Sequence, residues 1–263
     1  MPATEVSAVA NNLLRAMRFF GSARSTGEIR DIPGVCLISC GLNYAAFNAA
    51  LLSEPLSADV NELRTRIQAP AHHFCSRNLR WTYWLCDDYL HPSLRRESRS
   101  LFNSLGLATL TEPPGMFAER LLPPKRRLPD LVVRPVADEP TRRAFAHITS
   151  VAFEIPQTIC RDIYGSSLAW EGDFHGFVGY VDNLPVATAA TIVTAGVAGV
   201  YSVGTLPHCR KRGYAEALMR HALSMEREKS GIEATVLQAT QSGLRMYEQM
   251  GYSKITKFSV YIS

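Results

Sequence analysis

The sequence has little of several features that would place a protein in a specialised class. Its six cysteines form no C-x-x-C pair, which excludes a zinc ribbon or a dithiol redox motif. No uncharged apolar run approaches the roughly 20 residues that cross a bilayer, and the first 20 residues do not resemble a signal peptide. The 28 Lys and Arg residues are balanced by 24 Asp and Glu residues, without an arginine-rich arm. We therefore expect no nucleic-acid or membrane partner.

The cysteines also bear on location. Without a leader segment, the simplest interpretation is that they are reduced thiols, most of which serve as small core residues in a cytoplasmic protein. The adjacent His72, His73 and Cys75 offer three metal-binding side chains, but no fourth ligand is evident near them. We therefore predict no metal site.

What the chain does contain is enough apolar side chain for a large core, since 46% of its 263 residues are hydrophobic. That length suits one large domain or two of ordinary size. The segment 123–130 (PPKRRLPD) is rich in proline and basic residues, which favour solvent and interrupt regular structure. We therefore predict a domain at 1–122, a linker at 123–130 and a second domain at 131–263.

Both halves mix helices and strands. In the first half, spacing and composition predict three helices and four strands. The helices are expected at 5–20, 59–68 and 93–105, and the strands at 34–39, 45–52, 81–86 and 115–121. Side chains alternate between the two faces of the predicted strand 81–86, which places Trp84 on the face opposite Trp81 and Tyr83. At least one of these rings should therefore be exposed.

In the second half, we predict three helices and six strands, with a hairpin turn at 182–185. The helices are expected at 139–153, 213–229 and 242–250, and the strands at 131–135, 175–181, 186–194, 197–205, 234–238 and 255–262. These patterns predict an α+β fold around a mixed sheet.

One segment of the second half indicates chemistry. After the strand at 197–205, the sequence Arg210-Lys-Arg-Gly-Tyr-Ala215 leads directly into an amphipathic helix. Free backbone N–H groups at a helix start, together with the helix dipole, form a site suited to phosphate. Gly213 allows the main chain to approach a ligand closely. The segment therefore predicts binding of a diphosphate-bearing cofactor, although a helix entry with solvated basic residues is the plainer alternative.

A second segment, Leu237-QATQSGLRMYEQMG-Tyr252, carries Tyr247 on a short helix that Gly251 ends. The two segments together resemble motifs A and B of the GNAT (Gcn5-related N-acetyltransferase) superfamily. The first matches its Q/R-x-x-G-x-G/A loop through Arg210, Gly213 and Ala215. The resemblance covers about 131–263, and its specific motifs lie between about 203 and 252.

The resemblance implies acetyl-CoA as the co-substrate, without a metal, in a fold whose central strands splay apart. The pantetheine arm would pair with the backbone near Val203, Gly204 and Thr205, and Thr240 would contact the cofactor. The loop residues Arg210, Lys211, Arg212, Gly213, Tyr214 and Ala215 would hold the pyrophosphate. Tyr247 would protonate the departing thiolate, since a phenol of pKa ~10 is a reasonable acid for a thiolate of similar basicity. Its alternative role is that of an aromatic anchor between helix and sheet.

The resemblance further implies direct transfer of the acetyl group to a neutral amine, so Cys209 is not required as a nucleophile. The acceptor is expected to be an amine-bearing small molecule. The strands 197–205 and 234–238 lack the glutamate that many relatives use as a base. The residues that remain as candidates are Glu171, Asp173, His175, Tyr201 and His208. For this reason a non-catalytic acyl-CoA-binding sensor stays as the alternative function.

The first half lacks the cofactor loop. Its segments Phe47-NAALL, Trp81-TYWL and Pro114-GMFAERL are similar to the degenerate amino-terminal half of some two-domain acetyltransferases of this superfamily. Such a half would complete the core, wall the acceptor cleft or mediate formation of a homodimer.

Overall fold

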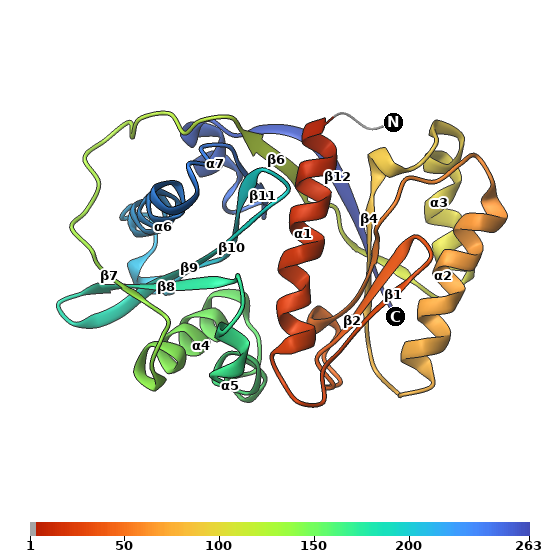
Figure 1. Cartoon of the computed structure of the whole chain (residues 1–263), viewed down its shortest axis with the longest axis horizontal. Coiled ribbons are helices and arrows are strands. Elements are labelled where there is room, and N and C mark those ends of the chain that lie inside the picture. The colour runs from red at the N-terminus through yellow and green to blue at the C-terminus, as the bar shows by residue number, and fades with distance from the viewer. Residues whose placement is uncertain (1–3) are drawn as a thin grey trace.

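A computed structural model describes residues 4–263 (Figure 1). The first half contains three α-helices and six strands among these residues. They are α1 (Thr4–Ser22), β1 (Glu28–Ile32), β2 (Val35–Ser39), β3 (Asn48–Leu52), α2 (Val60–Cys75), β4 (Thr82–Cys86), α3 (Pro92–Ser104), β5 (Ala108–Thr111) and β6 (Pro114–Ala118).

The segment from 119 to 131 carries neither helix nor strand, and the second half follows it. Its elements are β7 (Val132–Pro135), α4 (Glu139–Phe153), α5 (Gln157–Tyr164), β8 (His175–Val181), β9 (Leu184–Thr194), β10 (Val197–Thr205), α6 (Tyr214–Ser230), β11 (Thr235–Gln238), α7 (Leu244–Met250) and β12 (Ser253–Ile262). The predicted α+β fold with a mixed sheet is confirmed.

Local sequence signals explain where several elements begin and end. Helix α4 has the predicted bounds because Asp138 caps it, accepting a hydrogen bond from the Thr141 N–H at 2.9 Å. The hairpin turn between β8 and β9 is also confirmed. Its two central residues, Asp182 and Asn183, have positive φ angles of 51° and 62°, as a two-residue hairpin with this twist requires.

Other predictions were incomplete. The strands β1 and β5 were not predicted, and residues 45–47 form a 3-10 turn instead of the start of a strand. The predicted helix 59–68 continues to Cys75 as α2, with Pro70 inside it. Of the three aromatic residues around β4, Trp81 and Tyr83 are buried, whereas Trp84 is half-buried.

All twelve strands join one sheet. The order along it is β1-β2-β3-β4-β12-β6-β11-β10-β9-β8-β7, and β5 pairs with β12 beside this path. Strand β6 of the first half thus lies between β11 and β12 of the second, and β12 continues onto β4. The predicted domain boundary stays a prediction, but the hydrogen bonding at the centre of the sheet is shared by both halves.

The two halves repeat one pairing pattern. In the first, β1, β2 and β3 are antiparallel neighbours, and β3 then pairs in parallel with β4 across helix α2. In the second, β8, β9 and β10 are antiparallel neighbours, and β10 pairs in parallel with β11 across helix α6. This repetition agrees with the sequence-based prediction of a degenerate second copy.

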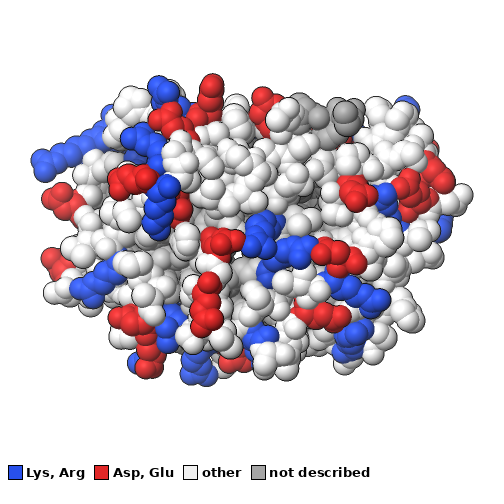
Figure 2. Space-filling view, in the orientation of Figure 1, with Lys and Arg blue, Asp and Glu red and all other residues white. Residues whose placement is uncertain are grey.

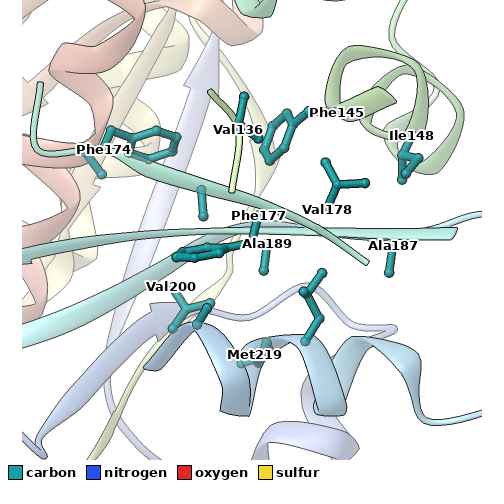
Figure 3. Close-up of a cluster of buried hydrophobic side chains, with 14 of the residues drawn as sticks. Val136, Phe145, Ile148, Phe174, Phe177, Val178, Ala187, Ala189, Val200 and Met219 are labelled. Atoms are coloured by element: carbon teal, nitrogen blue, oxygen red, sulfur yellow. The ribbon is translucent and has the colours of Figure 1, made fainter. Parts of the chain in front are cut away.

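Helices cover both faces of the sheet. In Figure 1, α1 crosses the middle of the molecule, α2 and α3 lie at one end, and α4 to α7 lie at the other. Figure 3 shows Phe145 and Ile148 of α4 on one face of the second half-sheet and Met219 of α6 on the other. Across residues 4–263, no helix has the length and apolar character needed to span a membrane.

Candidate active site

The central strands of the second half diverge. Strands β10 and β11 pair only through Ala198 with Thr235 and Gly199 with Val236. Beyond these pairs β11 continues along β6, while β10 stays with β9 as far as Thr205. No strand among the described residues pairs with the other edge of β10 from Val203 to Thr205. Apart from the Thr205 carbonyl, which accepts a hydrogen bond from the Arg210 side chain, the backbone groups at that edge are available to an extended ligand.

A bulge reshapes β10 at the divergence. The register against β9 shifts between Tyr201 and Gly204, and Ser202 between them has a φ of 49°. The Thr188 hydroxyl donates a hydrogen bond to the Ser202 carbonyl at 2.9 Å, which holds the bulge in place. Bulges often redirect a strand beside a functional site.

The loop that follows presents a row of free N–H groups. The first hydrogen bond of α6 runs from the Ala217 N–H to the Gly213 carbonyl at 3.0 Å. Within the described part of the chain, the backbone N–H groups of residues 211–216 donate no hydrogen bond, and no side chain caps the helix. Six consecutive free donors at a helix N-terminus form a site for an anion such as a diphosphate.

The basic side chains of this loop have different roles. The Arg210 guanidinium donates to the carbonyls of Thr205 and Ala152, at 3.2 and 3.4 Å, so it fastens the loop to β10 and α4. Lys211 and Arg212 are exposed and form no ion pair with any residue in the range 4–263. Their charge is therefore free to attract an anion.

The first half shows why it offers no equivalent site. Helix α2 stands in the position that α6 has in the second half, but its start is occupied by an acid. The Asp59 carboxylate accepts a hydrogen bond from the Asn61 N–H at 2.8 Å, and Glu62 lies in the first turn. Asp59 thus satisfies one of the free donors, and two carboxylates at a helix start disfavour a phosphate there.

Tyr247 and Thr240 lie on the other side of the divergence, after β11. The Tyr247 side chain packs over Gly243 at the start of α7 and against Tyr252, and the residue is 7% exposed. Burial raises the pKa of Tyr247 to about 12. The exposed Thr240 accepts a hydrogen bond from the Gly243 N–H at 3.3 Å. The predicted residues therefore follow the ends of the two diverging strands, the loop 210–215 after β10 and Thr240 and Tyr247 after β11.

The candidate bases lie in different surroundings. Asp173 forms an ion pair with Arg15 at 2.6 Å, while Glu171 and His208 are exposed. His175 is bonded through Nδ1 to Glu226 of α6, at 2.8 Å. Burial raises the pKa of Tyr201 well above its usual range, and its hydroxyl donates a hydrogen bond to Asn12. Within residues 4–263, no three His, Cys, Asp or Glu side chains gather as a metal site.

Sequence reasoning missed Asn12 of α1. Its carboxamide oxygen accepts a hydrogen bond from the Tyr201 hydroxyl at 2.6 Å. Its nitrogen donates to the carbonyls of Ile192, Thr194 and Val197, at 3.2 to 3.4 Å. Asn12 thereby fixes the tip of the β9–β10 hairpin and orients Tyr201 at the divergence. A polar residue on the apolar face of the first helix was the available signal.

Asn12→Ala is expected to lower the free energy of unfolding by about 2 kcal/mol, because it leaves a phenol and buried carbonyls without partners. Urea unfolding of the purified chain measures this change. Asn11→Ala, an exposed position on the same helix, is the control and should change stability little. Equal effects of the two substitutions would contradict the role assigned to Asn12.

Comparison with known proteins agrees with this geometry. Residues 169–255 match the family model described as an acetyltransferase (GNAT) domain. The second half contains a GNAT domain. The match includes β8 to β11, the loop of free N–H groups and α7 with Tyr247. It supports acyl transfer as the general class of chemistry.

Solved structures share the fold over nearly the whole chain. A GCN5-related N-acetyltransferase from Kribbella flavida is 18% identical, with a TM-score of 0.74 over 98% of this chain and 95% of its own. One from Sphaerobacter thermophilus is 15% identical, with a TM-score of 0.60 over 100% and 93%. A tandem GNAT protein from the clavulanic acid biosynthesis pathway is 9% identical, with a TM-score of 0.57 over 91% and 80%. No curated protein matches the chain.

Proposed function

We propose that the protein is an acetyl-CoA-dependent N-acetyltransferase that transfers an acetyl group directly to an amine. The observation that supports this proposal most strongly is the run of six free N–H groups at residues 211–216, beside the unpaired edge of β10. A helix start with this many unsatisfied donors suits a diphosphate. An open strand edge suits an extended chain that carries amide groups, such as pantetheine.

Acetyl-CoA supplies an activated acetyl group in a thioester. In this proposal, the loop from Arg210 to Ala215 and the edge from Val203 to Thr205 bind the cofactor on the β10 side, and Thr240 contacts it on the β11 side. Free backbone N–H groups on β10 polarise the thioester carbonyl. Holding the acetyl group beside the bound amine accounts for much of the expected acceleration.

Tyr247 is the proposed proton donor to the departing thiolate. Its burial alters the match of acidities expected from the sequence, because a phenol of pKa about 12 is a weaker acid than a typical thiol of pKa ~8.5. The phenol is protonated throughout the neutral range and can donate a hydrogen bond to the sulfur as negative charge develops. Complete transfer of the Tyr247 proton to the thiolate is energetically unfavourable. The phenolate that it leaves regains a proton from water.

No carboxylate on β10 or β11 removes the proton from the amine, since the sequences VAGVYSVGT and TVLQ contain none. We propose that water takes this proton and that the acceptor is a small amine. All six cysteines are free thiols, which agrees with the cytoplasmic location that we include in the proposal.

The missing carboxylate equally favours the alternative of an acyl-CoA-binding sensor without turnover. Calorimetry with acetyl-CoA, followed by assay of CoA release across a panel of amines, distinguishes the two. Binding together with release of CoA supports the enzyme, and binding without turnover for any amine supports the sensor. Absence of any heat of binding to the intact chain contradicts both.

A further inference from the structure

A cavity in the second half of the chain lies away from the gap between β10 and β11. It has a volume of about 250 Å³ and lies at the start of β8, between β7 and the later turns of α6. Its walls are mostly apolar and include Val133, Val136, Trp170, Phe174 and Phe177. None of the predicted cofactor residues lines it.

The cavity is also distant from the cofactor loop. Both touch helix α6, but Gly213 precedes its first turn, whereas Met225 and Lys229, near its end, line the cavity. At about 1.5 Å per residue, roughly 18 Å separate Gly213 from Met225. A ligand in the cavity would therefore not occupy the proposed cofactor site.

One polar group of the cavity is held rigidly. His175 is bonded through Nδ1 to Glu226, and the same carboxylate oxygen accepts a hydrogen bond from the Thr191 hydroxyl at 2.8 Å. Burial opposes ionisation of Glu226, yet these bonds hold the pKa of its carboxyl below its usual value. Within residues 4–263 the Nε2 atom of His175 has no hydrogen-bond partner. Because the ionised Glu226 can only accept, Nδ1 carries the proton, and Nε2 of the neutral imidazole is free to accept a hydrogen bond from a ligand.

The lining carries positive charge at Lys229, while the negative Glu226 carboxylate lies behind His175. Besides His175, its titratable residues are His221 and Lys229, and it includes no aspartate or glutamate. Lys229 forms no ion pair with any residue of the described chain. Aromatic and aliphatic walls with a cation at the rim complement a small molecule that has an apolar body and one negative group.

We propose that this cavity is a second small-molecule site, which binds a compact aromatic carboxylate. The ring lies among the aromatic and aliphatic walls, and the carboxylate lies at Lys229. This inference does not depend on the proposed acetyl transfer, because the cavity shares no residue with the proposed cofactor site.

The test is an NMR chemical-shift titration of the intact chain with benzoate and with its neutral counterpart, benzamide. We expect benzoate to bind with a Kd at or below about 1 mM, as a ligand of this size allows, and benzamide to bind at least tenfold more weakly. Saturable binding should persist when acetyl-CoA is present in excess. Absence of saturation with benzoate, equal affinity for benzamide, or competition by acetyl-CoA would each overturn the proposal.

Two variants locate the site. Lys229 is exposed, so Lys229→Met should fold normally and weaken benzoate binding about tenfold. The control is Lys254→Met, at an exposed position on β12, which should leave the affinity for benzoate unchanged. Val133→Phe places a ring in the half-buried wall and should abolish binding. Thermal unfolding confirms that each variant folds. Benzoate affinity that none of these substitutions changes would place binding elsewhere and refute the assignment.

Discussion

Gly213→Val is expected to weaken binding of acetyl-CoA by at least about 100-fold. Gly213 has a φ of 92°, a conformation in which a β-branched residue is strained. An added Cβ would also come within 3.1 Å of Pro129 and 3.2 Å of the Arg126 guanidinium, both in the segment 123–130. Relief of this crowding shifts the loop and misaligns the N–H groups that we propose bind the diphosphate. Calorimetric titration with acetyl-CoA measures the loss.

The chain offers a matched control at the other end of the same helix. Gly231 has a φ of 73°, but no atom lies within 4 Å of the position that its Cβ would take. Gly231→Val therefore carries a similar backbone cost without crowding the loop. It should lower thermal stability and leave the affinity for acetyl-CoA unchanged. If both variants lose affinity equally, or if Gly213→Val retains it, residues 210–215 do not form the diphosphate site.

Tyr247→Phe is expected to lower kcat about 100-fold, while the Kd of acetyl-CoA stays within about threefold of the parent value. The substitution removes one oxygen and keeps the ring that packs over Gly243. Tyr252→Phe is the control, because the Tyr252 hydroxyl bonds to Thr235 at 2.9 Å within the core. That variant should lose some stability and little activity. An unchanged kcat in Tyr247→Phe would leave Tyr247 as an aromatic anchor.

The pH profile gives an independent measure of the same residue. Burial raises the pKa of Tyr247, so the phenol keeps its proton at every pH below about 12. The rate should therefore rise with pH as the acceptor amine loses its proton, without a decline near pH 10 caused by this residue. A fall in kcat centred near pH 10, absent from Tyr247→Phe, would show that the phenol titrates like an exposed one.

Short-range signals account for the elements that were predicted well. Capping by Asp138, the turn at Asp182 and Asn183, and the free helix start at Gly213 all depend on residues within a few positions of each other. The strands that were missed lack such signals. β5 (Ala108–Thr111) is exposed along its whole length, and β1 is an edge strand with charged residues at alternate and adjacent positions. Their pairing with distant strands determines their structure.

The candidate site was likewise predictable only where it depends on short-range signals. The loop from Arg210 to Ala215 could be found from its own sequence, because the diphosphate site that we propose there depends on backbone groups and one glycine. The contact between Asn12 and Tyr201 joins residues 189 positions apart. The raised pKa of Tyr247 comes from the side chains packed around it. Neither property is encoded in a local pattern, so the sequence alone could supply the candidates but not their surroundings.

The final strand, β12, has a consequence for how the chain matures. Its last residues pair with β4, and the Ser259 hydroxyl bonds to the Asp87 carboxylate 172 positions earlier, at 2.7 Å. During synthesis β12 emerges from the ribosome well after β4, so one edge of β4 lacks its partner strand in the nascent chain. Contacts between such distant positions slow folding and leave intermediates prone to association. The sheet is therefore completed only after all the segments between β4 and β12 have been synthesised.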